Sequence, residues 1–540
     1  MKRLFESSGT RWLWGVTIGL IGVVVFGMGW ISYLYRDITQ LPVIASDEFL
    51  FIRTLFKMAD AISRHDWVGT FNYTWFNYGF AYFLGTLVIT LPGMLTDQWT
   101  WIVMAPRMIS TLSVAFSLGL IVDLFSRFRR PWVGLWVSLG IVSMPYVWQV
   151  GTWFHPDCLM LFWCVCMIWA LARDRGQSGR FFWWAVIFLG CAIGTKFQAI
   201  LVTPILLAYW ASYRVDDFKR EGYHAGLFRR MGRDACRIVV TLSGIFFVWN
   251  PYIVHPMGFK AFKRLLDINL AWGTEVVSIV DRFRFGVMLS YAGPIVIGIV
   301  GGAVATSVVI ACRRWTDFES RLIGIVGATA VLNILYMVLA VNNGWPHYYL
   351  VPVVLMWIAG VYTVFRFHNR IGIGLLVACI GVNLNYGVHM IYTELHRRNT
   401  EVARDTYRSA RESVTQILAP LVTPGDTVLA TTVSIVDFRT LGIGYLDLDA
   451  EVKNIQRRYV VQDAHEAYFR ARGFSIMPPF RDHTWIVIDK RTPYFKVGLE
   501  GGGDREFYKD ARLLISELVA GKWGYSLVYE SADVLILRRR

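Results

Sequence analysis

Charged residues are scarce in this chain, and their scarcity limits what kind of protein it is. They make up 17% of the 540 residues, while 55% are hydrophobic. Soluble domains carry about 25% charged residues, so the composition excludes a soluble globular protein and indicates a polytopic membrane protein. The net charge of +15 does not indicate a nucleic-acid partner, because many Lys and Arg residues lie in short loops between apolar segments. That is the pattern of cytoplasmic loops in membrane proteins.

Other familiar signals are also missing. The 7 cysteines fall in or beside apolar segments, and none has metal-ligand spacing with a histidine. We interpret them as packing residues, without a disulfide framework. The first apolar stretch, residues 12–34, is too long for a signal peptide, and no small-residue cleavage site follows it. We therefore expect an uncleaved first span with a cytoplasmic N-terminus. The GLEGGGDRE segment lacks the spacing of a phosphate-binding loop.

Long apolar stretches are what the chain has in abundance. A spanning helix needs about 20 apolar residues, and the sequence predicts about 11 such spans. They cover residues 12–34, 101–125, 132–150, 157–172, 181–195, 197–212, 235–255, 286–311, 322–341, 347–365 and 371–392. The stretch 76–95 is the exception, because its crossing would move five basic clusters, from RFRR to RFHNR, out of the cytoplasm. We predict that it is re-entrant or lies at the interface, within a first external loop of residues 35–100.

The chain after residue 392 has a different pattern. Residues 398–419 and 506–521 are predicted helices, and TVLATT, HTWIVIDK and YSLVYESADVLILRR are predicted strands. The predicted fold is therefore a polytopic α-helical membrane module, residues 1–392, followed by an α/β domain outside the membrane, residues 393–540. The span count puts this domain on the external side, which is the periplasm if the membrane is a bacterial inner membrane.

The predicted topology brings several polar features to the external face. They are Asp47 and Glu48 after the first span, Arg107 at the head of the next, His155 and Asp157 in an HPD tripeptide, Lys196 in a GTK, and His347, Tyr348 and Tyr349 in a late PHYY segment. Polar groups that are distant in sequence and meet on one side of the membrane indicate a site.

The order of these motifs resembles the C-type glycosyltransferase superfamily (GT-C), closest to the branch of protein O-mannosyltransferases and aminoarabinose-to-lipid-A transferases. The resemblance covers roughly residues 10–370, including the FNYTWFNYGFAYF run and the APRMISTL and PHYYLVP segments. It implies a polyprenyl-phosphate-linked sugar donor, an inverting transfer outside the cytoplasm, and an acidic general base in the first external loop. Two features depart from it: the late motif has Pro346-His347-Tyr348-Tyr349 where relatives often have a basic residue beside the Tyr pair, and the C-terminal domain suggests no acceptor.

The chemistry of such a transfer assigns roles to the acidic and basic residues. A carboxylate suits deprotonation of an acceptor hydroxyl. Asp47 is the predicted base, and Glu48 is predicted to orient the acceptor or help to bind a divalent cation, Mg²⁺ or Mn²⁺. A solvated loop position is the alternative for both. A cation suits the departing phosphate; Lys196 and Arg107 are predicted for this role, with simple interface anchoring as the alternative.

The remaining residues are predicted to support the site. His347 and Tyr348 are predicted to bind the donor phosphate or sugar, with an aromatic belt at the interface as the alternative. His155, Asp157 and Tyr349 are predicted to contact the acceptor or support its site, although a place at the start of a helix alone explains Asp157. The predicted partners are the donor, membrane lipids and a lipid, glycan or protein acceptor. The only candidate cofactor is the divalent cation, Mg²⁺ or Mn²⁺, and no set of metal ligands is assigned.

A transporter or flippase of a lipid-linked or small polar substrate is the competing function. Such proteins place ionisable groups near the bilayer midplane and are often built from two similar halves. Neither pattern is found in this sequence, which favours the transferase.

Overall fold

The computed structural model divides the chain into two compact units. Unit 1 comprises Met1–Arg36, Phe51–Pro251 and Val276–His396, and unit 2 comprises Asp37–Leu50, Tyr252–Glu275 and Arg397–Arg540. The residues that the structure describes are 8–38, 41, 46–71, 78–222, 225–256, 258–259, 262–263, 301–302, 304–306, 308–309, 317–340, 346–366, 370–403, 407–423, 425–431, 435–442, 444–447, 483–491, 515–521 and 523–540.

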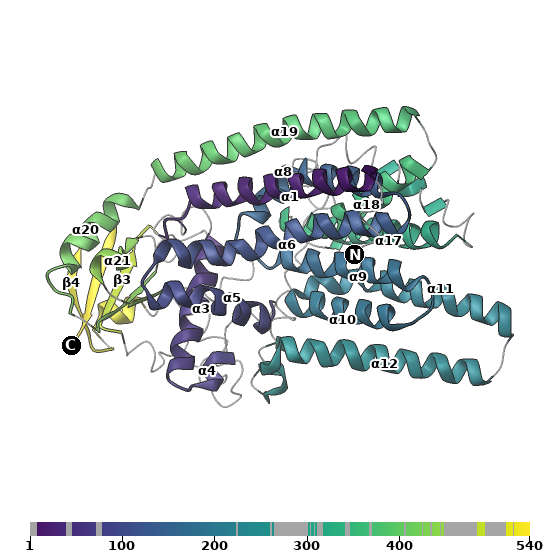
Figure 1. Cartoon of the computed structure of the whole chain (residues 1–540). Helices are drawn as coiled ribbons and strands as arrows, with labels where there is room; N and C mark the ends of the chain where they lie inside the picture. Colours follow the sequence, from purple (N-terminus) through teal and green to yellow (C-terminus); the bar gives the residue numbers. More distant parts are fainter. Residues whose placement is uncertain are drawn as a thin grey trace. The chain divides into compact units, whose positions relative to one another are not determined.

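Unit 1 is built from helices (Figure 1). In chain order they are α1 (Ser8–Leu34), α3 (Ser46–Ser63), α4 (Trp67–Phe71), α5 (Phe80–Leu95), α6 (Trp99–Arg127), α7 (Pro131–Val142), α8 (Pro145–Gly151), α9 (Asp157–Asp174), α10 (Arg180–Thr195), η2 (Phe197–Val202), α11 (Thr203–Glu221), α12 (Ala225–Trp249), η3 (Pro251–Val254), α17 (Phe318–Ala340), η4 (Pro346–Tyr349), α18 (Leu350–Arg366) and α19 (Arg370–Ala403). The first residues of α3, the residues of η3 after Pro251 and the last residues of α19 belong to unit 2.

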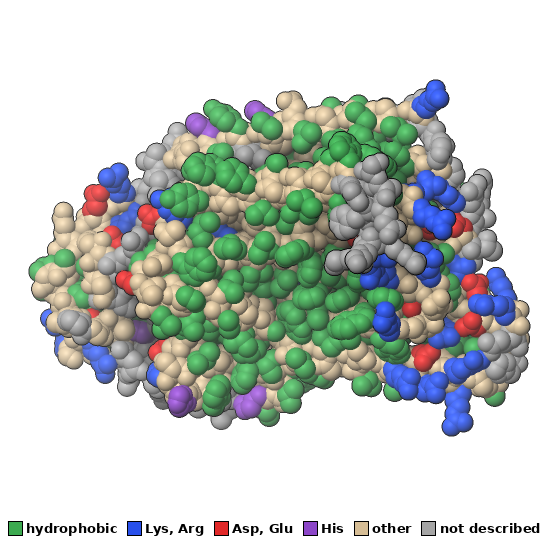
Figure 2. Space-filling model, in the orientation of Figure 1, with side chains coloured by type: hydrophobic (Ala, Val, Ile, Leu, Met, Phe, Trp, Pro, Cys, Tyr) green, Lys and Arg blue, Asp and Glu red, His purple; other side chains and the backbone are tan. Residues whose placement is uncertain are grey.

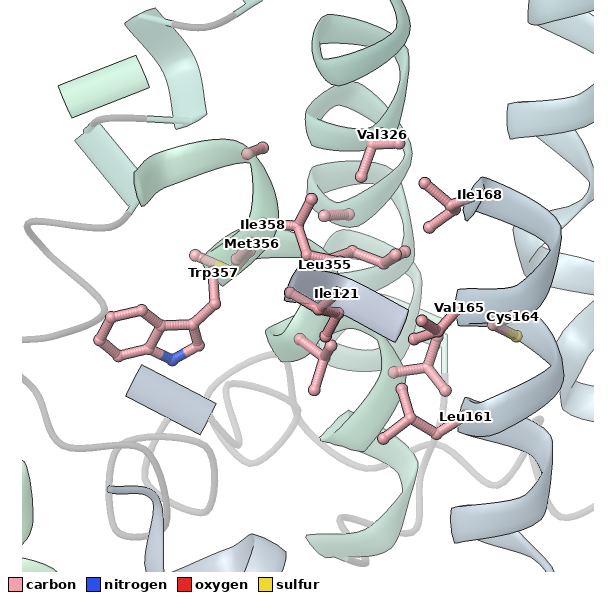
Figure 3. Packing of buried hydrophobic residues seen from close by; sticks show 14 of the residues in the cluster. Ile121, Leu161, Cys164, Val165, Ile168, Val326, Leu355, Met356, Trp357 and Ile358 are labelled. Carbon is pink, nitrogen blue, oxygen red and sulfur yellow. The ribbon is translucent and has the colours of Figure 1, made fainter. Parts of the chain in front are cut away.

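The core of unit 1 lies where α9 packs against α6 and α10, and α18 against α17 and α7. Its side chains interdigitate around Ile121, Leu161 and Trp357 (Figure 3). A Cβ on Gly140 would lie 2.3 Å from the Trp357 ring, so glycine is what lets this indole pack against α7. Lipid tails are as apolar as such a core, and close packing, more than the hydrophobic effect, therefore holds the helices together.

Several of these helices are long and apolar enough to cross a membrane. Within the described residues they are Trp12–Leu34, Trp99–Arg127, Phe318–Val338 and His347–Arg366, with α7 and α8 as a fifth if a pair bent by 76° counts as one span. Shorter apolar helices cover Phe80–Leu95, Arg180–Thr195 and Ile373–His389. The total of about 11 spans stays a prediction, and most of the predicted span 286–311 lies outside the described residues.

Two breaks in the helices bear on the predicted spans. The sequence predicted a span over 132–150, and these residues form the two helices α7 and α8, between which the chain bends by 76°. Met144 is extended (φ −80°, ψ 122°), which is what Pro145 imposes on the residue before it. The predicted break near Lys196 is confirmed: α10 ends at Thr195, and Lys196 is extended (φ −150°, ψ 125°).

The surface of unit 1 separates hydrophobic from basic side chains. Hydrophobic side chains cover its broad face, and Lys and Arg gather at the right-hand end in Figure 2, where α11 and α12 meet. Exposed basic residues there are Lys219, Arg220, Arg229, Arg230 and Arg233. This is the loop that the charge pattern assigns to the cytoplasm.

Unit 2 contains a five-stranded sheet of order β2-β1-β3-β5-β4. Its strands are β1 (Thr427–Ala430), β2 (Gly444–Asp447), β3 (Trp485–Asp489), β4 (Tyr525–Glu530) and β5 (Val534–Arg539). β1 pairs in parallel with β2 and β3, and β5 is antiparallel to β3 and β4. The three strand segments predicted from sequence are confirmed, the last as the two strands β4 and β5, whereas β2 was not predicted.

The helices of unit 2 follow the prediction in part. The predicted helix 398–419 is two helices, the end of α19 and then α20 (Arg408–Leu418), and α21 (Phe438–Leu441) is a further short one. Of the predicted helix 506–521, the described residues 515–519 are helical.

Candidate active site

A buried carboxylate organises the candidate site in unit 1. Asp157 is the first residue of α9, directly after Pro156, and its side chain is fully buried. The Lys196 ammonium donates to both of its oxygens, at 2.9 and 3.1 Å, and His155 Nδ1 contacts Oδ2. A charge this deeply buried must be paired, and Lys196 pairs it. The place at the start of a helix is confirmed for Asp157, but it is only part of what this residue does.

The backbone around Lys196 explains how the ammonium reaches this carboxylate. α10 ends at Thr195, and Lys196 forms an isolated antiparallel β-bridge with Tyr78. The Gly79 amide donates to the Thr195 carbonyl at 3.0 Å. A Cβ on Gly79 would lie 2.1 Å from the Gly194 carbonyl oxygen, so the two segments can approach this closely only because that residue is glycine.

Two aromatic rings flank the ammonium of Lys196. Its Nζ lies 4.9 Å from the centre of the Tyr348 ring and 5.6 Å from that of Tyr78, within the range of a cation–π interaction. η4 carries Tyr348, whose carbonyl accepts a hydrogen bond from Gln198 Nε2 at 2.8 Å. Lys196 is only 5% exposed. The simple anchoring alternative, in which the ammonium extends into solvent at the interface, is therefore wrong for Lys196.

Two histidines complete the cluster. The rings of His155 and His347 have centroids 4.7 Å apart, and His347 also packs edge-on against Tyr348 at 4.6 Å. His155 further contacts Phe51 and Tyr78, each at 5.6 Å between ring centres. Together with Asp157, the two histidines form a group that could hold a metal ion. One ligand atom from each of His155, Asp157 and His347 lies within 4.8 Å of the other two.

The predicted residue Tyr349 is also buried beside this cluster, at the end of η4.

Arg107 has a different environment. Its Nη1 donates to the carbonyls of Ser32 and Tyr35 at 2.7 and 3.0 Å, and its side chain is buried. These bonds tie the middle of α6 to the end of α1, so a structural role explains Arg107 without any bound phosphate.

Asp47 and Glu48 lie in the first turn of α3, in the part of that helix that belongs to unit 2. Glu48 is 2% exposed, so the solvated-loop alternative is wrong for this residue. The side chain of Asp47 lies outside the described residues, and its role as general base stays a prediction.

The sequence did not predict Tyr78 as a site residue, nor the ion pair between the two predicted site residues Asp157 and Lys196. Tyr78 lies in the FNYTWFNYGFAYF run, for which no site role was predicted, and its β-bridge has no sequence signal. The ion pair did have one. α9 and α10 have 18 and 16 residues and pack against each other. Consecutive helices of similar length joined by a short loop run antiparallel, which places the start of the first beside the end of the second.

No protein-family model matches this sequence, and no curated protein does. Among solved structures, the chain is similar to the crystal structure of ArnT from Cupriavidus metallidurans bound to undecaprenyl phosphate. The TM-score is 0.56 at 13% sequence identity, over 96% of this chain and 97% of that one. The apo crystal structure of the same protein matches with a TM-score of 0.54 at 13% identity, over 98% of both chains. ArnT is an aminoarabinose lipid A transferase and a GT-C protein. At this level of identity the likeness establishes the fold, and the chain has the GT-C fold that its motifs predicted.

Proposed function

We propose that this chain is a membrane glycosyltransferase that moves a hexosyl or pentosyl group from a polyprenyl-phosphate donor to a cell-envelope acceptor. The observation that carries the proposal is Lys196, an ammonium held at a helix end between Tyr78 and Tyr348. It lies in a fold shared along 96% of the chain with a transferase solved with undecaprenyl phosphate. A buried, fixed cation is the group that such a donor requires.

The reaction forms one bond and breaks one. An acceptor hydroxyl attacks the anomeric carbon, the bond from that carbon to the phosphate oxygen breaks, and the configuration inverts. The hydroxyl proton passes to the carboxylate of Asp47, acting as general base. The polyprenyl phosphate leaves with an added negative charge, which Lys196 stabilises.

The environment of Lys196 suits this task. Asp157 fixes the position of the ammonium in the absence of donor, and the neighbouring rings exclude water from it. A cation in a dry site interacts more strongly with a developing anion than one in water, and it needs no reorganisation during the reaction. A charge-assisted contact to the donor phosphate contributes about 1.5–3 kcal/mol.

The other groups of the cluster support the donor and the acceptor. His347 and Tyr348 lie beside the ammonium and contact the donor, while His155, Asp157 and Tyr349 hold the site in shape. Glu48 orients the acceptor, which is a lipid, a glycan or a protein. We place the chain in a bacterial inner membrane, with the N-terminus in the cytoplasm and the α/β domain in the periplasm.

The test combines a search for the substrates with one matched pair of variants. Mass spectrometry of envelope lipids and glycans from a deletion strain identifies the missing sugar and its acceptor. With these, purified Asp47→Asn should transfer about 10²-fold more slowly than the wild type and bind the donor normally. Asp60→Asn is the control, because Asp60 lies on the same helix and is well exposed. Near-normal turnover of Asp47→Asn would move the base to Glu48. Translocation of an intact donor without transfer would establish the flippase instead.

A further inference from the structure

Four arginines gather at the ends of three packed helices in unit 1, and we call them the arginine cluster. Arg127 ends α6, Arg173 lies in the last turn of α9, and Arg180 begins α10, while Arg175 follows the end of α9. α9 packs against both α6 and α10. At 1.5 Å per residue, Arg173 lies about 24 Å along α9 from Asp157. The proposed transfer therefore uses none of these arginines.

One carboxylate oxygen serves two of these guanidiniums, and its contacts to both are long. Asp123 Oδ2 accepts a hydrogen bond from Trp169 Nε1 at 2.7 Å. Arg173 Nη2 and Arg127 Nη2 lie 3.4 and 3.5 Å from the same oxygen, beyond the usual range of about 2.7–3.2 Å. The Nε atoms of both arginines are buried without a hydrogen-bond partner among the residues that the structure describes. Each guanidinium carries five N–H donors, so the protein leaves donors of both residues unused.

The charges of the arginine cluster do not balance. Asp174, the second carboxylate here, is buried and accepts hydrogen bonds from two backbone amides of the loop that follows it. Arg175 and Arg180 form no ion pair with any residue that the structure describes. Four arginines against two aspartates leave two surplus positive charges, and Arg173 is repelled by both Arg127 and Arg180. A bound anion would offset this surplus.

Largely buried arginines elsewhere in unit 1 are matched with carboxylates. Arg214 on α11 pairs with Asp217 and Asp234 at 2.9 and 2.6 Å. Arg321 on α17 pairs with Asp216 at 2.6 Å. These distances are those of good charge-assisted hydrogen bonds. The surplus charge and the long contacts therefore set the arginine cluster apart from these pairs.

Aromatic side chains indicate that the arginine cluster lies at the depth of lipid headgroups. The Arg173 guanidinium is 4.0 Å from the centre of the Trp169 ring, and that of Arg180 is 4.9 Å from the centre of the Phe181 ring. Trp184, one turn further along α10, is 49% exposed. Tryptophan is enriched at the membrane–water interface, where basic pockets between spanning helices bind anionic headgroups.

We propose that Arg127, Arg173 and Arg180 bind the headgroup phosphate of one anionic glycerophospholipid of the cytoplasmic leaflet. Guanidiniums donate two parallel hydrogen bonds to phosphate oxygens and suit this ligand better than ammonium groups do. An anionic headgroup offsets the surplus positive charge, and a zwitterionic one does so less well because it carries a cation of its own. The site is independent of the proposed transfer, since it lies at the other end of α9.

The experiment is native mass spectrometry of the purified full-length chain in detergent. The chain is titrated with phosphatidylglycerol, which is anionic, or with phosphatidylcholine of the same acyl chains, which is zwitterionic. We expect one phosphatidylglycerol to bind in preference. The double variant Arg173→Gln, Arg180→Gln should bind it at least about tenfold more weakly and lose the preference. Lys219→Gln, Arg229→Gln is the matched control, because it removes two exposed basic residues elsewhere, and it should bind like the wild type.

Three results would overturn the site: equal wild-type affinity for the two lipids, unchanged affinity in the site variant, or an equal loss in the control variant. Excess inorganic phosphate should not displace the lipid, and displacement would assign the cluster to a soluble phosphate instead. If the double variant does not fold, Arg180→Gln alone decides, because Arg180 is exposed. A loss of about fivefold in affinity supports the site, and no loss refutes it.

Discussion

Replacing Lys196 by Met tests the most specific contact in the molecule. The change keeps an unbranched stem up to the ε position and removes the ammonium that lies 2.9 Å from Asp157 Oδ1. The carboxylate stays fully buried and loses its cationic partner. Removing one member of a buried ion pair costs about 3–5 kcal/mol. His155 contacts the same carboxylate and offsets part of this cost, so we expect the lower end of the range.

The double variant Lys196→Met, Asp157→Asn separates the ion pair from simple packing. It removes both charges, and we expect it to recover more than half of the stability that Lys196→Met loses. Both variants should bind a polyprenyl-phosphate donor at least about tenfold more weakly, which corresponds to 1.4 kcal/mol, because both lack the cation. Lys196→Arg should restore binding only in part, since a planar guanidinium does not replace a point charge.

The assay is denaturant unfolding in detergent together with donor binding by the same purified protein. Lys219→Met is the control, because Lys219 is exposed near the end of α11, and it should change neither quantity. Wild-type stability in Lys196→Met would refute the buried pair. A destabilised but folded variant with unchanged donor affinity would leave Lys196 a purely structural residue, and the phosphate would have to be bound elsewhere.

Three further predictions concern other parts of the chain. A reporter fused after residue 98 should report the external side, because a crossing by 76–95 would export five basic clusters; a cytoplasmic signal contradicts the topology. Arg107→Met should destabilise the protein in thermal unfolding by removing two charge-assisted bonds to α1, about 1.5–3 kcal/mol each, with donor affinity kept in the folded protein. In unit 2, burial raises the pKa of Asp426, but hydrogen bonds, among them those from Thr423 and Trp485, bring it below the usual 3.8. The ionised Asp426 carboxylate therefore stabilises the folded state at neutral pH, and this stabilisation is lost as the pH falls through the lowered pKa. Asp426→Asn should lower the unfolding midpoint at pH 7 and have little effect below that pKa.

Most of the helical architecture could be predicted because each helix corresponds to a local apolar stretch in the sequence. The break at Lys196 followed from length alone, since an uninterrupted helix over 181–212 would be about 48 Å long at 1.5 Å per residue. The bend before Pro145 left an equally clear mark that we did not use, as proline restricts the residue before it. The span over 132–150 was predicted from hydrophobicity alone, which does not show a bend.

The composition of the site could be predicted, but its contacts could not. Asp157, Lys196, His155 and His347 were all predicted site residues, yet their pairing depends on how separate segments pack. His347 reaches His155 because η4 packs beside α8 and α18. The sequence of neither segment predicts that contact. The bridge between Tyr78 and Lys196 depends in the same way on Gly79, whose missing side chain lets it approach the distant Gly194 carbonyl.

Each of these residues has an adequate structural explanation when taken alone. A carboxylate suits a helix start, a lysine suits the interface, and a histidine beside two tyrosines suits an aromatic belt. Their meeting in one buried cluster changes the argument. Replacing a buried ion pair by apolar side chains of similar volume is often neutral or stabilising, so stability alone gives little reason to have one. In a membrane protein a buried ionisable residue indicates a function by default. The cluster around Asp157 combines an ion pair with a buried histidine nitrogen that has no hydrogen-bond partner among the described residues. This is why the proposed function centres on this part of unit 1.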